Sequence, residues 1–447
     1  MKLSRYLVAS DLLSVARTGF EGRVIFPTRT GRLTTMPETV WQMLQAGQWQ
    51  ALDPTLCQRL QDARVLVAED EDEFSSVVQE NIAAVAGHDV LYQVVQPSAW
   101  CQLDCSYCGQ EHSRKKLSET HQRDLLDRIR ERLASGRYRQ LKIGWFGAEP
   151  LAGLSVMRSL GERAQLLARE FGCDYSARIV TNGMALTPEV ARELSERHQV
   201  REAEVTLDGL ADQHDRLRFT KTGQGSFAKI FANLQAVCAA TELGIVVRCN
   251  VDRHNAAQVE ALIEAIAGAG LAGRVRFYTS PVYAWGNDAD QTALGPEEFA
   301  QLELEWLALQ LRLGFEVGLV PPRRPIVCLS VQRQGEVTDA YGSTFNCTEV
   351  PYVPAYGTPN QYQMAVPVHT IHFQRRPSEA PALKLRDFNQ QLLAGEHQQC
   401  AACRMLPVCG GHCPKSWHEG HAPCPSAKRN MPDRLNLLFA AALAVEA

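Results

Sequence analysis

The sequence predicts an α/β protein with a parallel sheet, because strand and helix patterns alternate six times between residues 90 and 280. Apolar runs typical of buried strands occur at 90–95, 141–146, 177–181, 203–207, 244–251 and 275–279. Segments with helical periodicity separate them, at 122–133, 156–170, 188–197, 227–240 and 258–269. Six such units form either a doubly wound sheet or an incomplete barrel, and periodicity alone does not distinguish the two.

Small and polar motifs follow the first three of these strands, each at the carboxyl end. A loop with three cysteines, at 101–108, follows the first strand, the run 147–150 follows the second, and 181–183 follows the third. In parallel sheets the loops at the carboxyl ends of the strands meet on one side and build the functional site. We therefore expect one site at this edge of the sheet.

The regions on either side of the alternating segment follow other patterns. The first 85 residues predict strands near 6–9 and 22–27, a turn at 30–31, helices at 37–44 and 54–60, and a short strand at 65–67. The acidic run 69–73 is expected to be a solvated linker. After residue 280 the pattern predicts a helix at 296–313, a proline-rich segment at 321–325, and a cysteine-bearing region with little regular structure.

Length, charge and cysteine content narrow the class of protein. A chain of 447 residues is long enough for two or three domains, and a net charge of −4 argues against nucleic acid as the main partner. The apolar stretches fall short of the roughly 20 residues of a membrane span. The N-terminus has no apolar signal core, so we expect a cytoplasmic protein without a membrane partner. In that compartment the 14 cysteines indicate metal or redox chemistry rather than disulfides.

The most informative feature is the run Cys101-Gln-Leu-Asp-Cys105-Ser-Tyr107-Cys108. Three thiolates this close can hold three irons of a 4Fe–4S cluster and leave the fourth iron open to a small molecule. The alternatives are a zinc knuckle and three unrelated buried thiols. Zinc sites usually pair Cys-x2-Cys with a second such pair, and the next cysteine in this chain is Cys173. The spacing therefore favours an iron–sulfur cluster.

The same spacing, with Tyr107 before the third cysteine, resembles the signature loop of the radical S-adenosylmethionine (radical SAM) enzymes. The resemblance implies a partial (β/α)6 barrel in which the open iron binds the amino and carboxylate groups of SAM. An electron from the cluster then releases a 5′-deoxyadenosyl radical. The run Gly147-Ala148-Glu149-Pro150 resembles the Gly-Gly-Glu-Pro motif that holds the methionine amino group in this family, with Ala148 as a departure. An N-capping loop would also explain it.

Further positions are assigned by the same resemblance. Thr181-Asn182-Gly183 matches a turn near the ribose, although Asn-Gly favours turns in any protein. The segment from Asp208 to Arg218 resembles one in the peptide-modifying branch of the family, and a solvated loop is the alternative. On the fifth strand, Arg248 and Asn250 share a face and are candidates for ribose or carboxylate contacts. Asp208 and Cys249 are the candidate general bases.

A second cysteine group lies near the C-terminus and matches the seven-cysteine SPASM pattern, at Cys328, Cys347, Cys400, Cys403, Cys409, Cys413 and Cys424. This resemblance implies two auxiliary 4Fe–4S clusters, and so three clusters in all. By position, Cys400, Cys403, Cys409 and Cys424 would ligate one cluster. Cys328, Cys347 and Cys413 would ligate the other and leave an open iron or a ligand still to be identified. One or two zinc sites, with His412, His418 or His421, are the alternative.

The remaining cysteines, Cys57, Cys173, Cys238 and Cys249, lie in apolar patterns and are expected to be buried structural thiols.

The resemblance divides the chain into three predicted domains. Residues 1–85 resemble a small winged-helix domain that recognises leader peptides, although a simple capping extension of the barrel fits the same pattern. Residues 86–315 are the radical SAM barrel, and residues 316–447 are the SPASM domain. Such a leader domain binds its peptide as an added strand.

The implied enzyme modifies a ribosomally made precursor peptide, forming a thioether or carbon–carbon crosslink, with an external flavodoxin-like or ferredoxin-like electron donor. The alternatives are an anaerobic sulfatase-maturing enzyme that makes formylglycine, a non-catalytic iron–sulfur scaffold, and a leader-binding chaperone.

Overall fold

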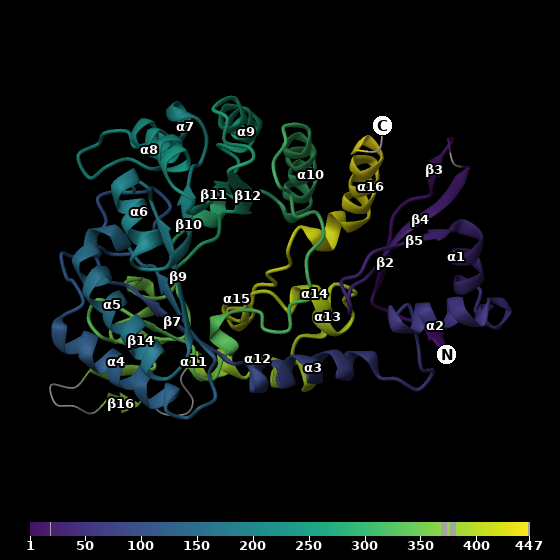
Figure 1. Cartoon of the computed structure of the whole chain (residues 1–447), viewed down its shortest axis with the longest axis horizontal. Helices are drawn as coiled ribbons and strands as arrows, with labels where there is room; N and C mark the ends of the chain where they lie inside the picture. Colours follow the sequence, from purple (N-terminus) through teal and green to yellow (C-terminus); the bar gives the residue numbers. More distant parts are fainter. Residues whose placement is uncertain (18, 368–372, 376–380, 446–447) are drawn as a thin grey trace.

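The predicted α/β class and the partial barrel are confirmed by a computed structural model, which describes residues 1–17, 19–367, 373–375 and 381–445. Six strands lie side by side in chain order, and every neighbouring pair is parallel (Figure 1). They are β7 (Val90–Val95), β8 (Gln140–Trp145), β9 (Asp174–Thr181), β10 (Val200–Thr206), β11 (Gly244–Val251) and β12 (Val275–Pro281). In a doubly wound sheet the order of the strands reverses part way across the sheet. The unbroken chain order of these six strands is instead that of an open barrel.

Helices cover the outer face of this barrel. They are α4 (Glu119–Leu133), α5 (Leu154–Glu170), α6 (Pro188–Glu196), α7 (Ala211–Leu217), α8 (Phe227–Ala240), α9 (Val259–Gly268) and α10 (Pro296–Arg312). The caps explain where some of them begin: Ser118 accepts a hydrogen bond from His121 N–H, and Thr187 accepts one from Val190 N–H with Pro188 in the first turn. Alternate strand residues such as Leu91, Ile143 and Val247 point outward into the core shared with these helices.

The sheet continues beyond the barrel through strands that the sequence did not predict. Strand β13 (Glu336–Thr338) pairs in parallel with β7, and β14 (Thr344–Phe345), β15 (Ala365–Pro367) and β16 (Phe373–Arg375) follow in antiparallel order. Buried Glu336 forms ion pairs with Arg128 at 2.9 Å and Arg132 at 2.6 Å, both on α4. These ion pairs hold β13 against the first barrel unit.

The rest of the C-terminal region consists mainly of short helices. They are α11 (Pro381–Arg386), α12 (Phe388–Leu393), α13 (Gln398–Ala401), α14 (Leu406–Cys409), α15 (Pro414–His418) and the longer α16 (Ala427–Val445). Along the whole described chain, short 3-10 turns occur at Trp49–Ala51, Pro150–Gly153, Ala256–Gln258, Ala289–Thr292, Leu329–Val331 and Pro354–Tyr356. The expectation of little regular structure in the cysteine-bearing C-terminal region was therefore only partly right. None of the helices in the described part of the chain combines the length and apolar character needed to cross a membrane.

The N-terminal region contains the expected strands and helices and several more. Its sheet is built from β2 (Leu7–Ala9), β3 (Leu13–Val15), β4 (Phe20–Pro27) and β5 (Thr34–Pro37), with β4 in the centre. Helices α1 (Glu38–Gln45) and α2 (Pro54–Asp62) follow, and β1 (Lys2–Leu3) pairs with β6 (Leu66–Val67). Asp53 is the N-cap of α2, because its carboxylate accepts a hydrogen bond from Thr55 N–H at 2.9 Å.

The acidic run 69–73 is only in part the solvated linker that the sequence predicted, because Glu69, Asp70 and Asp72 are exposed and Glu71 and Glu73 are not. It leads into α3 (Glu73–Gly87), whose first residue is buried and accepts a hydrogen bond from Ser4 Oγ at 2.5 Å. Arg29, also buried, forms ion pairs with Glu71 at 2.6 Å and Glu80 at 2.8 Å. The acidic side chains therefore compensate a buried guanidinium, which a charge pattern alone does not reveal.

The N-terminal sheet lies on the opposite side of the molecule from helices α4 to α8 of the barrel and next to α16 (Figure 1). One hydrophobic cluster combines Val8, Val24 and Phe26 of this sheet with Met405 and Val408 near the C-terminus. Thr28 Oγ1 also donates a hydrogen bond to the Arg404 carbonyl at 2.7 Å. The two ends of the chain are therefore parts of one folded unit.

All 14 cysteines are free thiols. Cys173, Cys238 and Cys249 are buried in the outer core of the barrel, as predicted. Cys57 is only half-buried, and its thiol donates to the Trp49 carbonyl at 3.3 Å.

Candidate active site

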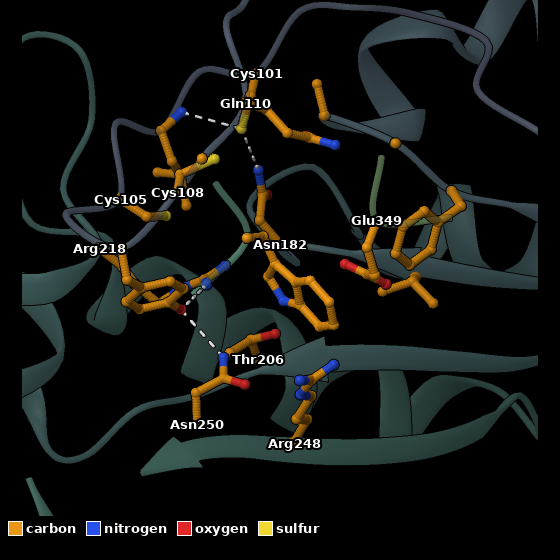
Figure 2. A pocket seen from close by; sticks show the side chains of 18 of the residues that line it. Cys101, Cys105, Cys108, Gln110, Asn182, Thr206, Arg218, Arg248, Asn250 and Glu349 are labelled. Atoms are coloured by element: carbon orange, nitrogen blue, oxygen red, sulfur yellow. Dashed lines mark hydrogen bonds between the residues drawn. The ribbon is translucent and has the colours of Figure 1, made fainter. Parts of the chain in front are cut away.

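Cys101, Cys105 and Cys108 line one cavity of about 210 Å³ at the carboxyl ends of the barrel strands, as expected from the placement of the motifs. The turns after β8 and β9 contribute Gly147, Ala148, Thr181 and Asn182, and β10 and β11 contribute Thr206, Arg248 and Asn250. Figure 2 shows the three cysteines on one side of the cavity and Arg248 and Glu349 on the other. Three thiols facing one cavity fit a 4Fe–4S cluster with an open iron.

Burial raises the pKa of all three thiols, so they ionise only when a cation binds them. It is the main reason that the pKa of Cys101 is raised to about 12 and that of Cys105 to about 11. Burial also raises the pKa of the Cys108 thiol. At neutral pH the three side chains are therefore protonated until a metal displaces the protons, which is the usual coupling of metal binding to thiol ionisation.

The segment 217–221 after α7 holds the cysteine loop in place. Ser106 N–H donates to the Leu217 carbonyl at 2.9 Å, and Asp104 N–H donates to the Phe219 carbonyl at 2.8 Å. Lys221 N–H donates in return to the Gln102 carbonyl at 3.0 Å. The loop is thus hydrogen-bonded to this segment nearly from end to end, which gives an irregular backbone a defined shape.

Tyr107 is fixed by the strand ends behind it. Its hydroxyl donates to Asp208 Oδ2 at 2.5 Å and accepts from Asn250 Nδ2 at 3.2 Å and from the Arg218 guanidinium. Asp208 Oδ1 accepts from Asn250 N–H at 2.8 Å, and Arg218 lies 3.8 Å from the same carboxylate. Asp208 and Arg218 are buried, so the solvated-loop alternative is wrong for this segment. Asp208 is engaged in positioning Tyr107 and is not among the residues that line the cavity.

Glu149 lies behind the cavity and ties the second and third strand-end turns together. Its carboxylate accepts from Thr181 Oγ1 at 2.7 Å, Asn182 N–H at 2.8 Å and Leu151 N–H at 2.8 Å. Complete burial raises the pKa of this carboxyl group, and the three donors oppose that rise. Glu149 and Pro150 do not line the cavity, although the sequence placed both with the cofactor-binding residues.

Two other motif residues meet the cavity directly. At Gly147, with φ of 113°, a Cβ atom would lie 2.8 Å from the Gln96 Cβ, so this position requires glycine. Asn182 Nδ2 donates to Cys101 Sγ at 3.5 Å, and its Oδ1 accepts from Gln102 Nε2 at 3.1 Å. The third-strand turn therefore contacts the cysteine loop directly.

Arg248 and Glu349 bring charge to the far side of the cavity. Arg248 Nη2 donates to Ser280 Oγ at 3.4 Å, Nη1 lies 3.9 Å from Glu204, and the buried Nε has no hydrogen-bond partner among the residues described. Glu349 accepts from Thr348 Oγ1 at 3.0 Å, and burial raises the pKa of its carboxyl group. A guanidinium and a carboxyl group in one cavity suit a zwitterionic or peptide ligand.

The sequence did not identify several of these lining residues. Glu349 comes two residues after Cys347, while Tyr283, Trp285 and Val353 come from loops outside the six barrel units. Position beside a cysteine was the only signal in the sequence that pointed to Glu349. Cys249, proposed as a base, points outward into the hydrophobic core and does not line the cavity.

Four C-terminal cysteines surround a second, small and apolar cavity, together with Met405, Leu406 and Trp417; they are Cys400, Cys403, Cys409 and Cys424. Burial, followed by the neighbouring thiols, raises the pKa of Cys400 and of Cys409 to about 12. Four thiols around one space form the donor set of a fully ligated 4Fe–4S cluster.

Cys328, Cys347 and Cys413 form the third thiol group. Burial is the main cause that raises the pKa of Cys328 and of Cys347, and the charge of Cys413 raises both further. Cys328 Sγ also lies 2.8 Å from Ser330 Oγ. Within the described ranges, no three His, Cys, Asp or Glu side chains converge as a single metal ion requires.

Comparisons with known proteins place this geometry in a family. The radical SAM superfamily profile matches residues 95–273, which run from the last residue of β7 through β8, β9, β10 and β11 to the loop before β12. The serine-type anaerobic sulfatase-maturating enzyme of Bacteroides thetaiotaomicron is 24% identical over 369 residues, which cover 73% of this chain and 83% of that enzyme. The mycofactocin maturase MftC of Mycobacterium tuberculosis is 30% identical over 162 residues, 36% of this chain and 37% of that protein.

Among solved structures, native anSMEcpe with bound AdoMet and the Cp18Cys peptide superposes with a TM-score of 0.58 at 16% identity. The match covers 79% of this chain and 99% of that one, and it shows a shared fold. The superfamily match and the three cysteines that face the cavity make residues 95–273 a radical SAM domain, so the protein is an enzyme that uses S-adenosylmethionine and a 4Fe–4S cluster.

Proposed function

We propose that this enzyme matures a ribosomally made precursor peptide by forming a thioether or carbon–carbon crosslink. The observation that carries the proposal is the composition of the cavity wall. One side is built from the cysteine loop and strand-end turns, and the other from Glu349 and Val353, which follow Cys347 in the C-terminal region. The similarity to a mycofactocin maturase and to an enzyme solved with a bound peptide supports a peptide substrate.

In this proposal Cys101, Cys105 and Cys108 ligate the reactive cluster, which with SAM supplies a carbon-centred radical able to remove hydrogen from an unactivated carbon. Tyr107 and its hydrogen-bond partners keep the cysteine loop rigid. Ala148 and Asn182 line the cavity with that loop and would contact SAM, and Arg248 would offer its free Nε to a carboxylate. The cavity walls exclude water from the reacting carbon.

Glu349 is a carboxyl group in the cavity wall, and burial raises its pKa above the usual range of a glutamate. Crosslinking removes two hydrogens from the peptide: one as a hydrogen atom, the other as a proton and an electron. Glu349 would accept the proton, and the two auxiliary clusters proposed for the SPASM domain, residues 316–447, would take up the electron.

The other domains keep the roles that the sequence predicts for them. Residues 86–315 are the barrel, and residues 1–85 bind the leader peptide along their sheet. An external flavodoxin-like or ferredoxin-like protein supplies electrons. Fourteen free cysteines suit the reducing cytoplasm, where we place the enzyme.

A sulfatase-maturing activity, which oxidises Ser or Cys to formylglycine, is the second candidate. The observation that favours it is the length of the match to the serine-type sulfatase-maturating enzyme, which covers 73% of this chain. The same cavity serves both reactions, since each begins with removal of a hydrogen atom from a peptide side chain.

The first test is an anaerobic assay of reconstituted protein for 5′-deoxyadenosine, with iron quantitation. Three clusters correspond to about twelve irons per chain, falling to about eight when the three loop cysteines are alanine. We expect 5′-deoxyadenosine from the parent and none from the Cys101→Ala/Cys105→Ala/Cys108→Ala variant. Unchanged 5′-deoxyadenosine in that variant would contradict the ligand assignment.

A second assay separates the two candidate reactions. The enzyme is incubated with a short peptide encoded next to its gene, and in parallel with a sulfatase peptide that contains the Ser or Cys to be oxidised. A crosslinked peptide resists tryptic or reductive separation, whereas formylglycine reacts with a hydrazide probe. A hydrazide-reactive product from the sulfatase peptide alone would overturn the crosslinking proposal.

A further inference from the structure

A single lysine side chain is buried within an aromatic cage at the boundary between the barrel and the C-terminal region. The Lys415 side chain is 1% exposed. Its Nζ lies 4.7 Å from the ring centre of Tyr356, 4.8 Å from that of Trp285 and 5.5 Å from that of Tyr362. It also donates to Glu419 Oε2 at 2.5 Å. Aromatic faces attract a desolvated ammonium, so the cage holds the charge in one place.

The cage joins three chain segments that matter to the proposed chemistry. Trp285 lines the reaction cavity, and Tyr356 and Tyr362 belong to the segment that follows Cys347. Lys415 itself comes two residues after Cys413. Cys347 and Cys413 belong to the same group of three thiols, and Cys347 packs against the hydrophobic cluster that contains Tyr356 and Tyr362, so the cage adjoins that group.

Electrostatic contacts support this placement. Burial is the main cause that raises the pKa of Tyr356 and of Tyr362, and the nearby Cys347 thiol contributes to both. The charge of Lys415 also acts on Glu349, after the larger effects of burial, Arg248 and Thr348. The ammonium is therefore within reach of both the thiol group and the cavity carboxyl group.

A buried ion pair is a costly way to fill space, since apolar residues of similar volume usually serve stability as well or better. The partner carboxylate is itself held, because Tyr362 Oη donates to Glu419 Oε1 at 2.7 Å. The cage thus holds a positive charge and a fixed negative charge side by side. Fixed charges and hydrogen bonds around an iron–sulfur cluster set its reduction potential.

We infer that Lys415 is a positioning residue that sets the reduction potential of the auxiliary cluster held by Cys328, Cys347 and Cys413. The reduced cluster carries one more negative charge than the oxidised cluster, and the ammonium stabilises it. Glu419 moderates this effect. The inference rests on the proposed auxiliary cluster, and its test separates the failure of one from the failure of the other.

The experiment is a redox titration followed by electron paramagnetic resonance, on the full-length protein with Cys101, Cys105 and Cys108 replaced by alanine. Dithionite and redox mediators supply the electrons. We expect Lys415→Met to shift the potential of one auxiliary signal downward and Glu419→Gln to shift the same signal upward. Lys415→Arg, which retains the charge, should leave the potential close to that of the parent.

The opposite signs distinguish electrostatic tuning from a structural role, because disruption of the cage would affect both variants in the same direction. Shifts of equal sign, or unchanged potentials with full iron content, would overturn the inference. Iron quantitation on the protein that lacks only the three loop cysteines provides the second readout. About four irons instead of about eight would show that the three-cysteine group holds no cluster, and the inference would then fail with it. If Lys415→Met loses iron, Glu419→Gln and Lys415→Arg still decide the outcome.

Discussion

At the scale of single residues, the site depends on buried polar groups that form hydrogen bonds with one another. Tyr107 shows this well: its hydroxyl joins Asp208, Arg218 and Asn250, three side chains from three different parts of the barrel. Removing one member of such a network leaves the others without partners in a dry environment, which costs more than the bond itself.

We therefore predict that Tyr107→Phe lowers the free energy of unfolding by about 1–3 kcal/mol, since Asp208 and Arg218 lose a shared partner. The ring and its contact with the cavity are retained. Tyr175→Phe is the matched control, because the buried Tyr175 hydroxyl has no hydrogen-bond partner in the described part of the protein. Urea denaturation of the apoprotein measures both. Equal losses in the two variants would show that the network adds nothing.

Sequence reasoning reached part of this site and missed the rest for a physical reason. The cysteine loop, Asn182 and Arg248 belong to local patterns at strand ends, and all of them line the cavity. Glu349 and Trp285 enter it through contacts between distant segments, which no local pattern encodes. Glu149 was placed with the cofactor-binding residues, yet its carboxylate holds two turns together from behind.

At the scale of elements, the barrel strands and helices were predictable because each is an apolar run of the right period between polar turns. The predicted strands 90–95 and 244–251 and the helix 227–240 agree with β7, β11 and α8 to the residue. Strand β13 was not predictable, because it is three residues long and exists through pairing with β7. Helix α3 was not predicted because it begins within an acidic run, in which Glu71 and Glu73 form ion pairs with Arg29.

The turn after β9 is the element on which the site geometry depends most. Gly183 has a φ of 81°, and a Cβ atom there would lie 2.7 Å from Val205 Cγ1. Gly183→Ala therefore combines backbone strain with a steric clash, and we expect it to cost about 2–4 kcal/mol of stability and to weaken SAM binding. Thermal unfolding and equilibrium dialysis with SAM measure the two effects.

Gly172→Ala isolates the backbone contribution. Gly172 has a similar φ of 64°, and nothing lies within 4 Å of a Cβ atom at that position. It should cost only about 1 kcal/mol and leave SAM binding unchanged. If the two variants lost the same stability, the contact with Val205 would not be the cause.

At the scale of the whole molecule, the N-terminal sheet and the four-cysteine group share one hydrophobic cluster. Phe26, fully buried, packs with Met405 and Val408, which lie in the segment between Cys403 and Cys409. Arg5 Nη2 also donates to the Ala401 carbonyl at 2.6 Å. The proposed leader-binding domain therefore packs against the segment that carries the four cysteines, so we expect changes in one to affect the other.

This arrangement predicts that Phe26→Ala speeds the loss of iron from the four-cysteine cluster. The truncation costs about 3–5 kcal/mol by opening a cavity against Met405 and Val408, and the cysteine segment loses its support. Trp41→Ala is the control, because Trp41 is buried in a separate cluster within the N-terminal domain. Its truncation should lower the free energy of unfolding by a similar amount. Iron release to a chelator, measured in protein that lacks the three loop cysteines, compares them. Faster release from Phe26→Ala alone supports direct coupling, and equal release from both would attribute the effect to overall stability.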